Sequence, residues 1–432
     1  MKKKRVTKLL GATLALAIGC VTAFSNVGVV KVMGKELSES EKVELSDDEI
    51  KSLLDEKNYS FTRDSVHDPS VIDGRNGYYY VFGSHAAVSK TNDFMNWTNV
   101  CTDNKADSTL FGKVGSDGKV SAVSFDEAFN NNETKEVTVL VDGKETKVDF
   151  GNFDAEAWNT ARDNFTVNGN MWAPDVIYND TMNKWCMYLS LNGSKWNSSI
   201  ILLTADDVEG PYVYQGPVMY SGFSTTKEAL SYKNTDLELA IGDLEALPEK
   251  YDKADSSQWG EYWPHAIDPC VFYDEEGKLW LAYGSWSGGI YVIELDETTG
   301  LRDYTVKYDS DFEEKGKSVT TDEYFGKKIA GGHYVSGEGS YIQHIGDYYY
   351  LFMSYGFYSP EGGYNMRIFR SETPDGNYVD TTGQDAKYTS FALNYNADWG
   401  TIKDYRGDRL MTNYQWDSMD TPEVSQGQTL LW

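Results

Sequence analysis

Acidic residues next to proline or glycine recur at the starts of short apolar segments, and they are the best candidates for chemistry in this sequence. Asp68 stands in the tripeptide HDP, Asp268 in IDP and Glu338 in GEG. A single Asp-Pro pair is usually a turn or a strand cap, but three acids at matching places indicate a site. Two carboxyls that flank a bond, one protonated and one ionised, are what glycoside hydrolysis requires. A third carboxylate nearby would raise the pKa of the acid and keep it protonated near neutral pH.

A unit that recurs four times from residue 61 onward must position these acids. Each copy runs through a short apolar strand, a turn and an aromatic strand, and the copies begin at Asp68, Pro174, Asp268 and Glu338. A second half follows, with a strand, an Asp-containing turn and the aromatic start of a fourth strand. Repeated four-stranded units indicate the blades of a β-propeller, and an ordinary β-sandwich is the alternative. In a propeller the innermost strands start at one mouth of the central channel, so we expect the three acids to meet there.

Two insertions lengthen the spacing between these units. The first covers about residues 103–165 and is predicted to contain a β-hairpin over 137–150 that turns at Asp142-Gly143. The second covers about residues 225–260, is polar and is predicted to carry helical stretches. Both are expected to shape the rim of the cleft.

A fifth unit should follow Tyr378, and residues 409–414 are predicted to begin it. The sequence stops at Trp432, before this blade can be completed. The predicted fold class is therefore all-β, a five-bladed β-propeller with two insertions and an incomplete last blade, which occupies residues 61–432 as one domain.

The composition favours a β-rich globular protein and disfavours several classes of partner. Hydrophobic residues make up 40% of the 432 residues, and 31 Tyr and 12 Trp stand against only 10 Pro. Such aromatic residues suit short twisted strands and a site that stacks on flat ligands such as sugars. The formal net charge is −28, which would repel nucleic acid and anionic membranes. We expect a monomer without a membrane-spanning segment.

The N-terminus predicts export. A basic start and an apolar run that ends in small residues form a signal peptide over residues 1–23, too short to span a membrane. Cys20 follows Ala-Ile-Gly and resembles a lipobox, so a lipid anchor through Cys20 is the alternative to secretion. Residues 24–60 are expected to form a polar spacer with one short helix.

At this point the sequence resembles a known family, family 43 of the glycoside hydrolases, and within it the secreted bacterial endo-α-1,5-L-arabinanases. The motifs that carry the resemblance extend in order from residue 61 to about residue 412. They are HDPSVI at 67–72, YYYVFGSH at 78–85, MWAPDVIY at 171–178, NGS at 192–194, IDP at 267–269, YGSWSGGIYVIELD at 283–296, EGSYI at 338–342 and GGYNMRIFRSETPDGNY at 362–378.

The resemblance implies a five-bladed propeller and an inverting mechanism. Asp68 would be the general base that activates water, Glu338 the general acid, and Asp268 the group that tunes the pKa of the acid and orients it. The substrate contacts implied in this way are Asp68, Trp172, Gly193, His265, Ala266, Ile267, Asp268, Ser285, Trp286 and Ser287. Trp172 is either a stacking floor or a buried core residue. Asp175, interpreted as lying at an equivalent blade position, either lines the cleft or is a structural hydrogen-bond acceptor.

The sequence departs from the family pattern in the fifth blade. The family carries a His in a Gly-His-Asn motif that helps to bind calcium, and Gln428 stands in that place here. The resemblance implies that the chemistry needs no cofactor and that a structural calcium ion is possible. The replacement by Gln428 disfavours tight binding of that ion, although carboxylates and carbonyls in the channel suit it.

Three functions remain open from the sequence. The leading one is an extracellular endo-acting hydrolase of linear α-1,5-arabinan or arabino-oligosaccharides. The second is an exo-acting α-L-arabinofuranosidase or β-xylosidase of the same family, since an open cleft and a deep pocket cannot be distinguished from the insertions. The third is an inactive secreted carbohydrate-binding propeller, against which the presence of all three carboxyls argues.

Overall fold

The computed structural model describes most of the chain after residue 61. The described ranges are 62–101, 109–124, 127–128, 136–141, 143–149, 155–162, 171–193, 196–253, 258–334, 337–356, 364–388 and 406–412. The predicted signal peptide and spacer, residues 1–60, lie outside these ranges.

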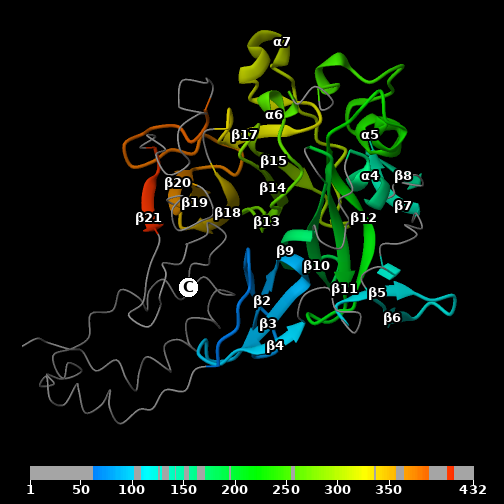
Figure 1. The fold of residues 1–432 in the computed structure, drawn as a ribbon, viewed down its shortest axis with the longest axis vertical. Helices are drawn as coiled ribbons and strands as arrows, with labels where there is room; N and C mark the ends of the chain where they lie inside the picture. The colour runs from blue at the N-terminus through cyan, green and yellow to red at the C-terminus, as the bar shows by residue number, and fades with distance from the viewer. Residues whose placement is uncertain are drawn as a thin grey trace, which may run out of the picture. The chain divides into compact units, whose positions relative to one another are not determined.

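Four sheets follow one another along the chain, and in each sheet the strands are added nearly in sequence order (Figure 1). The first sheet contains β1 (Ser70–Asp73), β2 (Tyr79–Gly83), β3 (Ala87–Thr91) and β4 (Thr98–Cys101). The core of the second contains β9 (Met171–Asn179), β10 (Lys184–Asn192), β11 (Ser198–Ala205) and β12 (Tyr212–Ser221). The third contains β13 (Cys270–Tyr273), β14 (Leu279–Ser285), β15 (Gly289–Leu295), β17 (Gly326–Ala330) and β16 (Thr321–Asp322). The fourth contains β18 (Glu338–Ile345), β19 (Tyr348–Tyr355), β20 (Asn365–Ser371) and β21 (Asp408–Thr412).

The first strands of the four sheets surround a common channel. A cavity of about 310 Å³ is lined by Val71 of β1, Val176 of β9, Val271 of β13 and Ile342 of β18, among others. Figure 1 shows the blue, green, yellow and orange sheets arranged around this centre. Each sheet is therefore one blade, and the predicted β-propeller is confirmed.

The inner hairpins show why the repeated motif is visible in the sequence. In each blade the first two strands are antiparallel and are joined by a tight turn. Each turn contains a residue with positive φ, a conformation that glycine adopts readily and asparagine tolerates. These residues are Gly77, Asn183, Gly277 and Gly346.

The core lies between blades rather than on one side of each sheet. All eight residues of β11 are buried, with the sequence SSIILLTA. Strands that are covered on both faces are apolar throughout instead of alternating. A continuous cluster of buried apolar and aromatic side chains joins the first three blades, and a second cluster joins the third and fourth blades.

The first insertion adds strands and a helix beside the second blade. β5 (Phe111–Val114) pairs in parallel with β12 and carries β6 (Val120–Ala122) on its other edge. β7 (Glu136–Val141) and β8 (Lys144–Asp149) form the predicted hairpin, with Val141 opposite Lys144. The helix α4 (Ala155–Thr160) follows. The hairpin prediction is confirmed.

The second insertion is helical, as predicted. It contains the 3₁₀ helices η4 (Glu228–Leu230), η5 (Tyr232–Asn234) and η6 (Glu249–Tyr251) and the α-helices α5 (Leu237–Ile241) and α6 (Trp259–Tyr262). Three further short helices lie elsewhere among the described residues, namely η2 (Ser84–Ala86), α7 (Phe312–Lys315) and η8 (Gly316–Ser318).

The prediction that residues 409–414 begin a fifth blade is wrong. β21 pairs antiparallel with β20 and completes the fourth blade. The strand expected at Tyr378 does not form, because Asp380 accepts hydrogen bonds from the backbone N–H groups of Thr382 and Gln384 and turns the chain back. Residues 413–432, which include the rest of the predicted fifth blade, lie outside the described ranges.

Candidate active site

The innermost strands begin with an unusual backbone conformation. Asp68, Ala173 and Asp268 have φ values of 52°, 44° and 52°, and each directly precedes a proline, which comes just before β1 and β13 and lies within β9. A left-handed conformation costs a residue with a side chain about 1–2 kcal/mol, and such strain collects at functional sites. Asp68 and Asp268 therefore occupy equivalent places in the first and third blades. In the fourth blade Glu338 comes one residue before Gly339, which has the matching φ of 59°.

Asp68 is held by a hydroxyl group that also contacts the next blade. The Ser84 hydroxyl donates to Asp68 Oδ2 at 2.5 Å, and the Ala173 backbone N–H donates to Ser84 Oγ at 2.9 Å. His67 Nδ1 lies 3.3 Å from the same carboxylate oxygen, and the Asp68 side chain is 25% exposed. A fixed carboxylate that is open to solvent suits a base that takes a proton from water. Ser84 belongs to the quoted motif YYYVFGSH, but its role was not foreseen.

Asp268 is buried beside the other two acids. It accepts one hydrogen bond, from the Gly339 N–H to Oδ2 at 3.2 Å. Burial raises the pKa of Asp268 well above its usual range, and the charges of Glu338 and Asp68 raise it further. The Gly339 contact places Asp268 beside the segment that carries Glu338. The meeting of all three acids at one mouth of the channel stays a prediction.

Glu338 is surrounded by three hydrogen-bond donors. Oε2 accepts from Trp286 Nε1 at 2.7 Å and from the Ser285 hydroxyl at 3.5 Å, and Oε1 accepts from the Tyr364 hydroxyl at 2.8 Å. Burial raises the pKa of Glu338 and the charge of Asp68 adds to this, while the three donors act in the opposite direction. A carboxyl with a raised pKa suits a general acid.

These contacts add to the predicted roles of the loop at 285–287. Ser285 and Trp286 were expected to contact substrate, and the structure places both on the carboxylate of Glu338. Tyr364 was missed as a functional residue, although it lies within the quoted motif GGYNMRIF. Its buried hydroxyl reaches Glu338 from the segment before β20.

The segment 265–268 leads directly into Asp268. Burial lowers the pKa of His265 to about 4, so its imidazole is neutral near neutral pH. Ala266 is fully buried and its N–H donates to the Ser221 hydroxyl at 3.0 Å. Ile267 is also buried, and its carbonyl accepts from the Gly284 N–H at 2.9 Å. These two residues therefore hold the segment in place.

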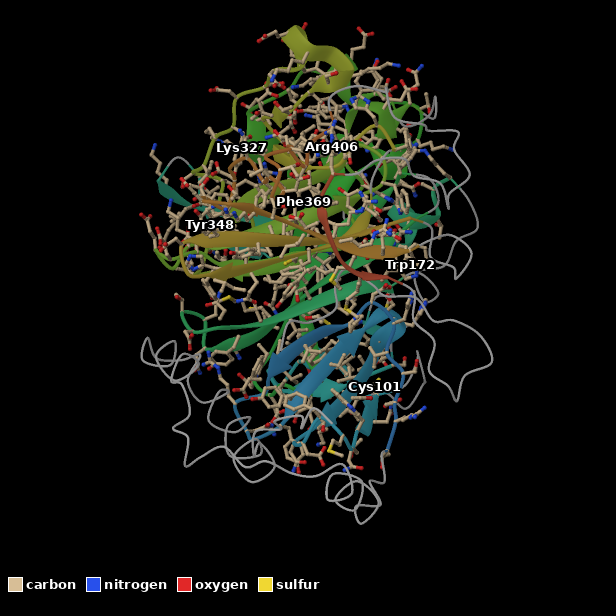
Figure 2. The ribbon with its side chains drawn as sticks, turned by 90° about the vertical axis from the view of Figure 1, so that its left-hand side faces the viewer. Cys101, Trp172, Lys327, Tyr348, Phe369 and Arg406 are labelled. Carbon is tan, nitrogen blue, oxygen red and sulfur yellow. The ribbon has the colours of Figure 1, made fainter. Side chains whose placement is uncertain are left out.

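The other predicted contacts lie on neighbouring segments. Trp172 is half-buried at the start of β9, and its carbonyl accepts from the Ser190 hydroxyl at 2.7 Å (Figure 2). A Cβ atom at Gly193 would lie 2.2 Å from the Asn197 carbonyl oxygen, so close packing alone requires glycine there. Ser287 is buried at the end of the loop that reaches Glu338.

Asp175 does not occupy the place of Asp68 and Asp268, because that place belongs to Ala173. Asp175 Oδ1 accepts from the Ser70 hydroxyl at 2.6 Å and from its neighbour Val176 N–H at 3.1 Å. Oδ2 accepts from the Val271 N–H at 2.6 Å. The carboxylate thus joins the inner strands of three blades, and burial raises its pKa to about 6. Asp175 is a structural hydrogen-bond acceptor, which was one of the two alternatives.

The same link recurs at the other blade junctions in the described part of the chain. Ser70 Oγ accepts from the Val176 N–H at 3.4 Å, and Cys270 Sγ accepts from the Ile342 N–H at 3.2 Å. Ser70, Asp175 and Cys270 each directly follow a proline. Each of the first three blades therefore supplies one acceptor to the inner strand of the next blade.

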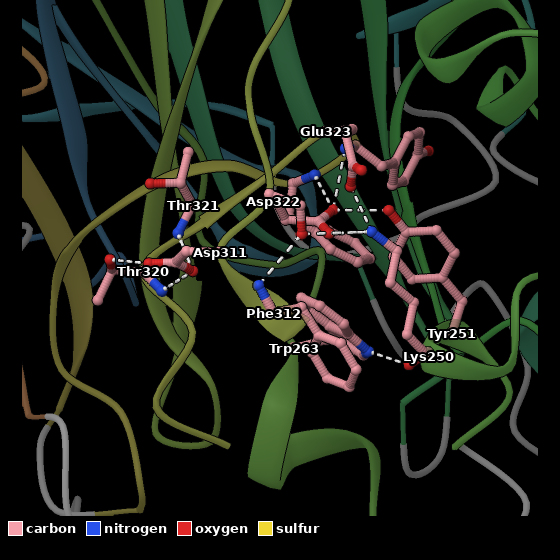
Figure 3. Close-up of polar contacts among 12 residues, drawn as sticks. Lys250, Tyr251, Trp263, Asp311, Phe312, Thr320, Thr321, Asp322 and Glu323 are labelled. Atoms are coloured by element: carbon pink, nitrogen blue, oxygen red, sulfur yellow. Dashed lines mark hydrogen bonds and ion pairs between the residues drawn. The ribbon is translucent and has the colours of Figure 1, made fainter. Parts of the chain in front are cut away.

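The second insertion is fastened to the third blade behind the site (Figure 3). Lys250 forms ion pairs with Asp322, at 3.0 Å, and with Glu323, and the Tyr251 hydroxyl donates to Asp322 Oδ1 at 2.8 Å. Trp263 Nε1 donates to the Lys250 carbonyl at 2.6 Å. These contacts fix the end of the insertion directly before the segment that carries Asp268.

A metal site of the expected kind is not visible in the described ranges. Within them, no group of three or more His, Cys, Asp or Glu side chains is arranged to hold a metal ion. Gln428 lies outside these ranges, so the reduced calcium binding stays a prediction, and no chemical step below uses an ion. None of the helices in the described part of the chain is long and apolar enough to cross a membrane.

Comparison with known proteins agrees with this site. The chain is 30% identical over 334 residues to the extracellular endo-α-(1→5)-L-arabinanase of Thermotoga petrophila, an alignment that covers 77% of this chain and 54% of that relative. It is also 30% identical over 365 residues to the extracellular endo-α-(1→5)-L-arabinanase 2 of Bacillus subtilis, covering 83% of this chain and 59% of that relative. The chain thus spans somewhat more than half the length of these relatives.

A solved structure shows the same fold. The crystal structure of endo-1,5-α-L-arabinanase from Thermotoga petrophila RKU-1 superposes with a TM-score of 0.55 at 28% identity, over 84% of this chain and 62% of that chain. The sequence profile of the glycosyl hydrolases family 43 matches residues 253–399, a range that contains Asp268, Glu338 and Tyr364. The propeller fold and these matches make the chain similar to glycosyl hydrolases family 43, whose profile matches residues 253–399.

Proposed function

We propose that this protein is an extracellular, inverting glycoside hydrolase that cleaves internal α-1,5-L-arabinofuranosidic bonds of arabinan. The observation that carries the proposal is the set of three carboxyls at the starts of the innermost strands of three blades, in which Asp68 is solvent-accessible while burial raises the pKa of Asp268 and Glu338. An accessible base and a protonated acid are the two groups that glycoside hydrolysis uses.

In this mechanism Asp68 removes a proton from a water molecule that attacks the anomeric carbon. Glu338 donates its proton to the leaving oxygen, and Trp286 and Tyr364 hold its carboxyl group in position. Asp268 has the role that the family resemblance implies, which is to tune the pKa of Glu338 and to orient it. An inverting enzyme needs room for water between base and acid, so we expect about 6.5–9.5 Å between the carboxyl groups of Asp68 and Glu338. The first product should have inverted anomeric configuration.

The proposed substrate and location rest on the relatives and on charge. The two relatives reported above are named as extracellular endo-arabinanases, and the signal peptide predicted over residues 1–23 favours export here too. A net charge of −28 suits a neutral polymer such as arabinan better than an anionic one.

Release of reducing sugar from debranched arabinan, with the products separated by size, tests the proposal. Oligosaccharides as first products are expected. Arabinose alone would replace the endo assignment by an exo-acting enzyme, and binding without any release would favour a carbohydrate-binding propeller. Asp68→Asn should abolish release, whereas Asp180→Asn is a matched control because Asp180 is an exposed partner of Arg75 on the outer surface.

A further inference from the structure

The rings of Trp196, His265 and Tyr334 form a cluster that has no part in the mechanism above. The Trp196 ring lies 5.9 Å from the His265 ring at an interplanar angle of 78°, and 6.2 Å from the Tyr334 ring at 55°. Trp196 and Tyr334 are both partly exposed. A large aromatic residue that is fixed at its edges while part of its surface stays accessible is suited to stacking on a ligand.

The helix α6 packs against this cluster so tightly that only glycine fits. A Cβ atom at Gly260 would lie 2.3 Å from the Tyr334 hydroxyl oxygen, 2.6 Å from Ser287 Cβ and 2.8 Å from Trp196 Cη2. The helix α6, at the end of the second insertion, therefore packs against the Trp196 ring. The position of its ring is set by protein packing, so little conformational entropy remains to be lost when a ligand binds.

The cluster belongs to the segments that carry Asp268 and Glu338. His265 lies three residues before Asp268, and Tyr334 lies four residues before Glu338. The Tyr334 N–H donates to the Ser287 carbonyl at 3.3 Å, which ties this segment to the loop that holds Glu338. Asp68, by contrast, is held by Ser84 of the first blade. Trp196 therefore packs against one side chain of the segment that leads to Asp268 and one of the segment that leads to Glu338.

The same cluster holds unused hydrogen-bonding capacity. His265 Nε2 and the Ser287 hydroxyl are buried and have no hydrogen-bond partner within the described ranges. Buried polar atoms are nearly always paired, and exceptions often mark functional sites. The imidazole is neutral because burial lowers its pKa to about 4, so it can donate or accept with a neutral hydroxyl group.

We infer that Trp196, supported by Tyr334, Gly260 and His265, forms a stacking subsite for a furanose ring of the substrate chain beyond the scissile bond, on the side of Glu338. The inference rests on the proposed function, because it needs a polymeric sugar in the cleft. It adds a residue that sets how many sugar units the enzyme binds. The preference for long over short chains then depends on the Trp196 ring.

Binding in a hydrolysis-deficient background tests this subsite. With Glu338→Gln as the parent, calorimetry measures the Kd of short and long linear α-1,5-arabino-oligosaccharides. Trp196→Ala should weaken binding of the long ligands by about tenfold, the size expected for one ring contact, and weaken the shortest ligand less. Trp196→Phe should restore most of the affinity. Equal loss for short and long ligands, or no loss, would overturn the subsite.

Two further variants separate this role from a structural one. Trp97→Ala removes a half-buried Trp beside β4 at the outer edge of the first blade, and it should leave the Kd of the long ligands unchanged. Trp196→Leu keeps apolar volume if Trp196→Ala does not fold, and it should still lose the preference for long ligands. If wild-type protein does not cleave arabinan, the proposed function fails and the subsite fails with it. If wild type cleaves arabinan but Trp196 variants keep the chain-length preference, only the subsite fails.

Discussion

Two buried aspartates on neighbouring blades, Asp175 on β9 and Asp268 before β13, differ in what surrounds them. Burial raises the pKa of both, that of Asp175 to about 6 and that of Asp268 well above its usual range. Asp175 accepts three hydrogen bonds, two of them from backbone N–H groups. Asp268 accepts one, and its other close neighbours are the carboxyls of Glu338 and Asp68.

This difference separates a structural carboxyl from a chemical one. A raised pKa reports burial in both places, so by itself it does not identify an active site. The neighbours decide the role. Fixed donors from three blades hold Asp175 as a link between strands, whereas Asp268 has a single donor within the described ranges and its pKa is raised further by the charges of Glu338 and Asp68.

The largest effect is expected on activity when the proposed general acid, Glu338, is changed. Glu338→Gln should lower kcat/KM on arabinan by about 10²–10⁴-fold, because the leaving oxygen loses its proton donor. Part of the rate should remain on a nitrophenyl substrate, whose leaving group needs no protonation. Initial rates and thermal unfolding are measured together, and the melting temperature should stay near that of wild type. A folded variant with near wild-type rates on arabinan would refute the assignment of the acid.

Asp175→Ala should lower the free energy of unfolding and leave kcat nearly unchanged, because Asp175 is a structural acceptor. The backbone N–H groups of Val176 and Val271 lose an acceptor in a buried place, so the free energy of unfolding should fall by about 2–4 kcal/mol. Unfolding in guanidinium measures this, and kcat of the folded fraction should stay close to wild type. Asp180→Ala serves as the control, because an exposed ion pair contributes at most about 1 kcal/mol. A loss no greater than in this control would show that the link between blades is unimportant.

The pKa of Asp175 also predicts how stability depends on pH. The folded-state pKa of about 6 exceeds the unfolded value of 3.8, so the folded state binds the proton more tightly. This contribution is complete below about pH 4 and is lost as pH rises to about 6, with a total on the order of 2–3 kcal/mol. Unfolding measured from pH 4 to pH 7 in wild type and in Asp175→Ala isolates it. The stability deficit of the variant should shrink as pH rises, and a constant deficit would contradict the assignment.

Asp268→Asn tests whether the charge of Asp268 affects the pKa of Glu338. Removing this charge should lower the pKa of Glu338, so the basic limb of the kcat/KM profile should move to lower pH. The rate at neutral pH should fall by about one order of magnitude. A basic limb that does not move would show that Asp268 is already protonated in the working enzyme.

The smallest effect is expected for Tyr364→Phe, and it has the opposite sign. The Tyr364 hydroxyl lowers the pKa of Glu338 by donating to its carboxylate. Without it the pKa should rise and the basic limb should move to higher pH, while kcat changes by less than about tenfold. Recording both pH profiles side by side is the measurement. Movement of both limbs in the same direction would contradict the electrostatic account of Asp268 and Tyr364.

Much of this protein was readable from the sequence because its determinants are local. Each blade repeats the same short order of apolar strand, turn and aromatic strand, and the turns use Gly77, Gly277 and Gly346 because a positive φ is needed there. The Asp-Pro pairs place Asp68 and Asp268 at the same point of their blades. The four-stranded units and the channel followed from this repetition.

The sequence-based predictions were wrong where the position of a residue or strand depends on strand register or on contacts with distant residues. Asp175 and Pro174 look like a displaced copy of Asp68 and Pro69, but the left-handed residue of the second blade is Ala173. β21 was mistaken for a new blade because the turn at Asp380 removes the expected fourth strand, and the chain returns to the blade only at Asp408.

By itself the sequence determined the propeller class, the family resemblance and the three acids, since these depend on residue types at short spacing. Only the tertiary structure decided that Ser84 holds Asp68, that Tyr364 and Trp286 hold Glu338, and that Asp175 joins blades. These contacts join residues 16 to 105 positions apart. Their physical reason is the packing of one blade against the next, which brings together donors and acceptors that no local pattern relates.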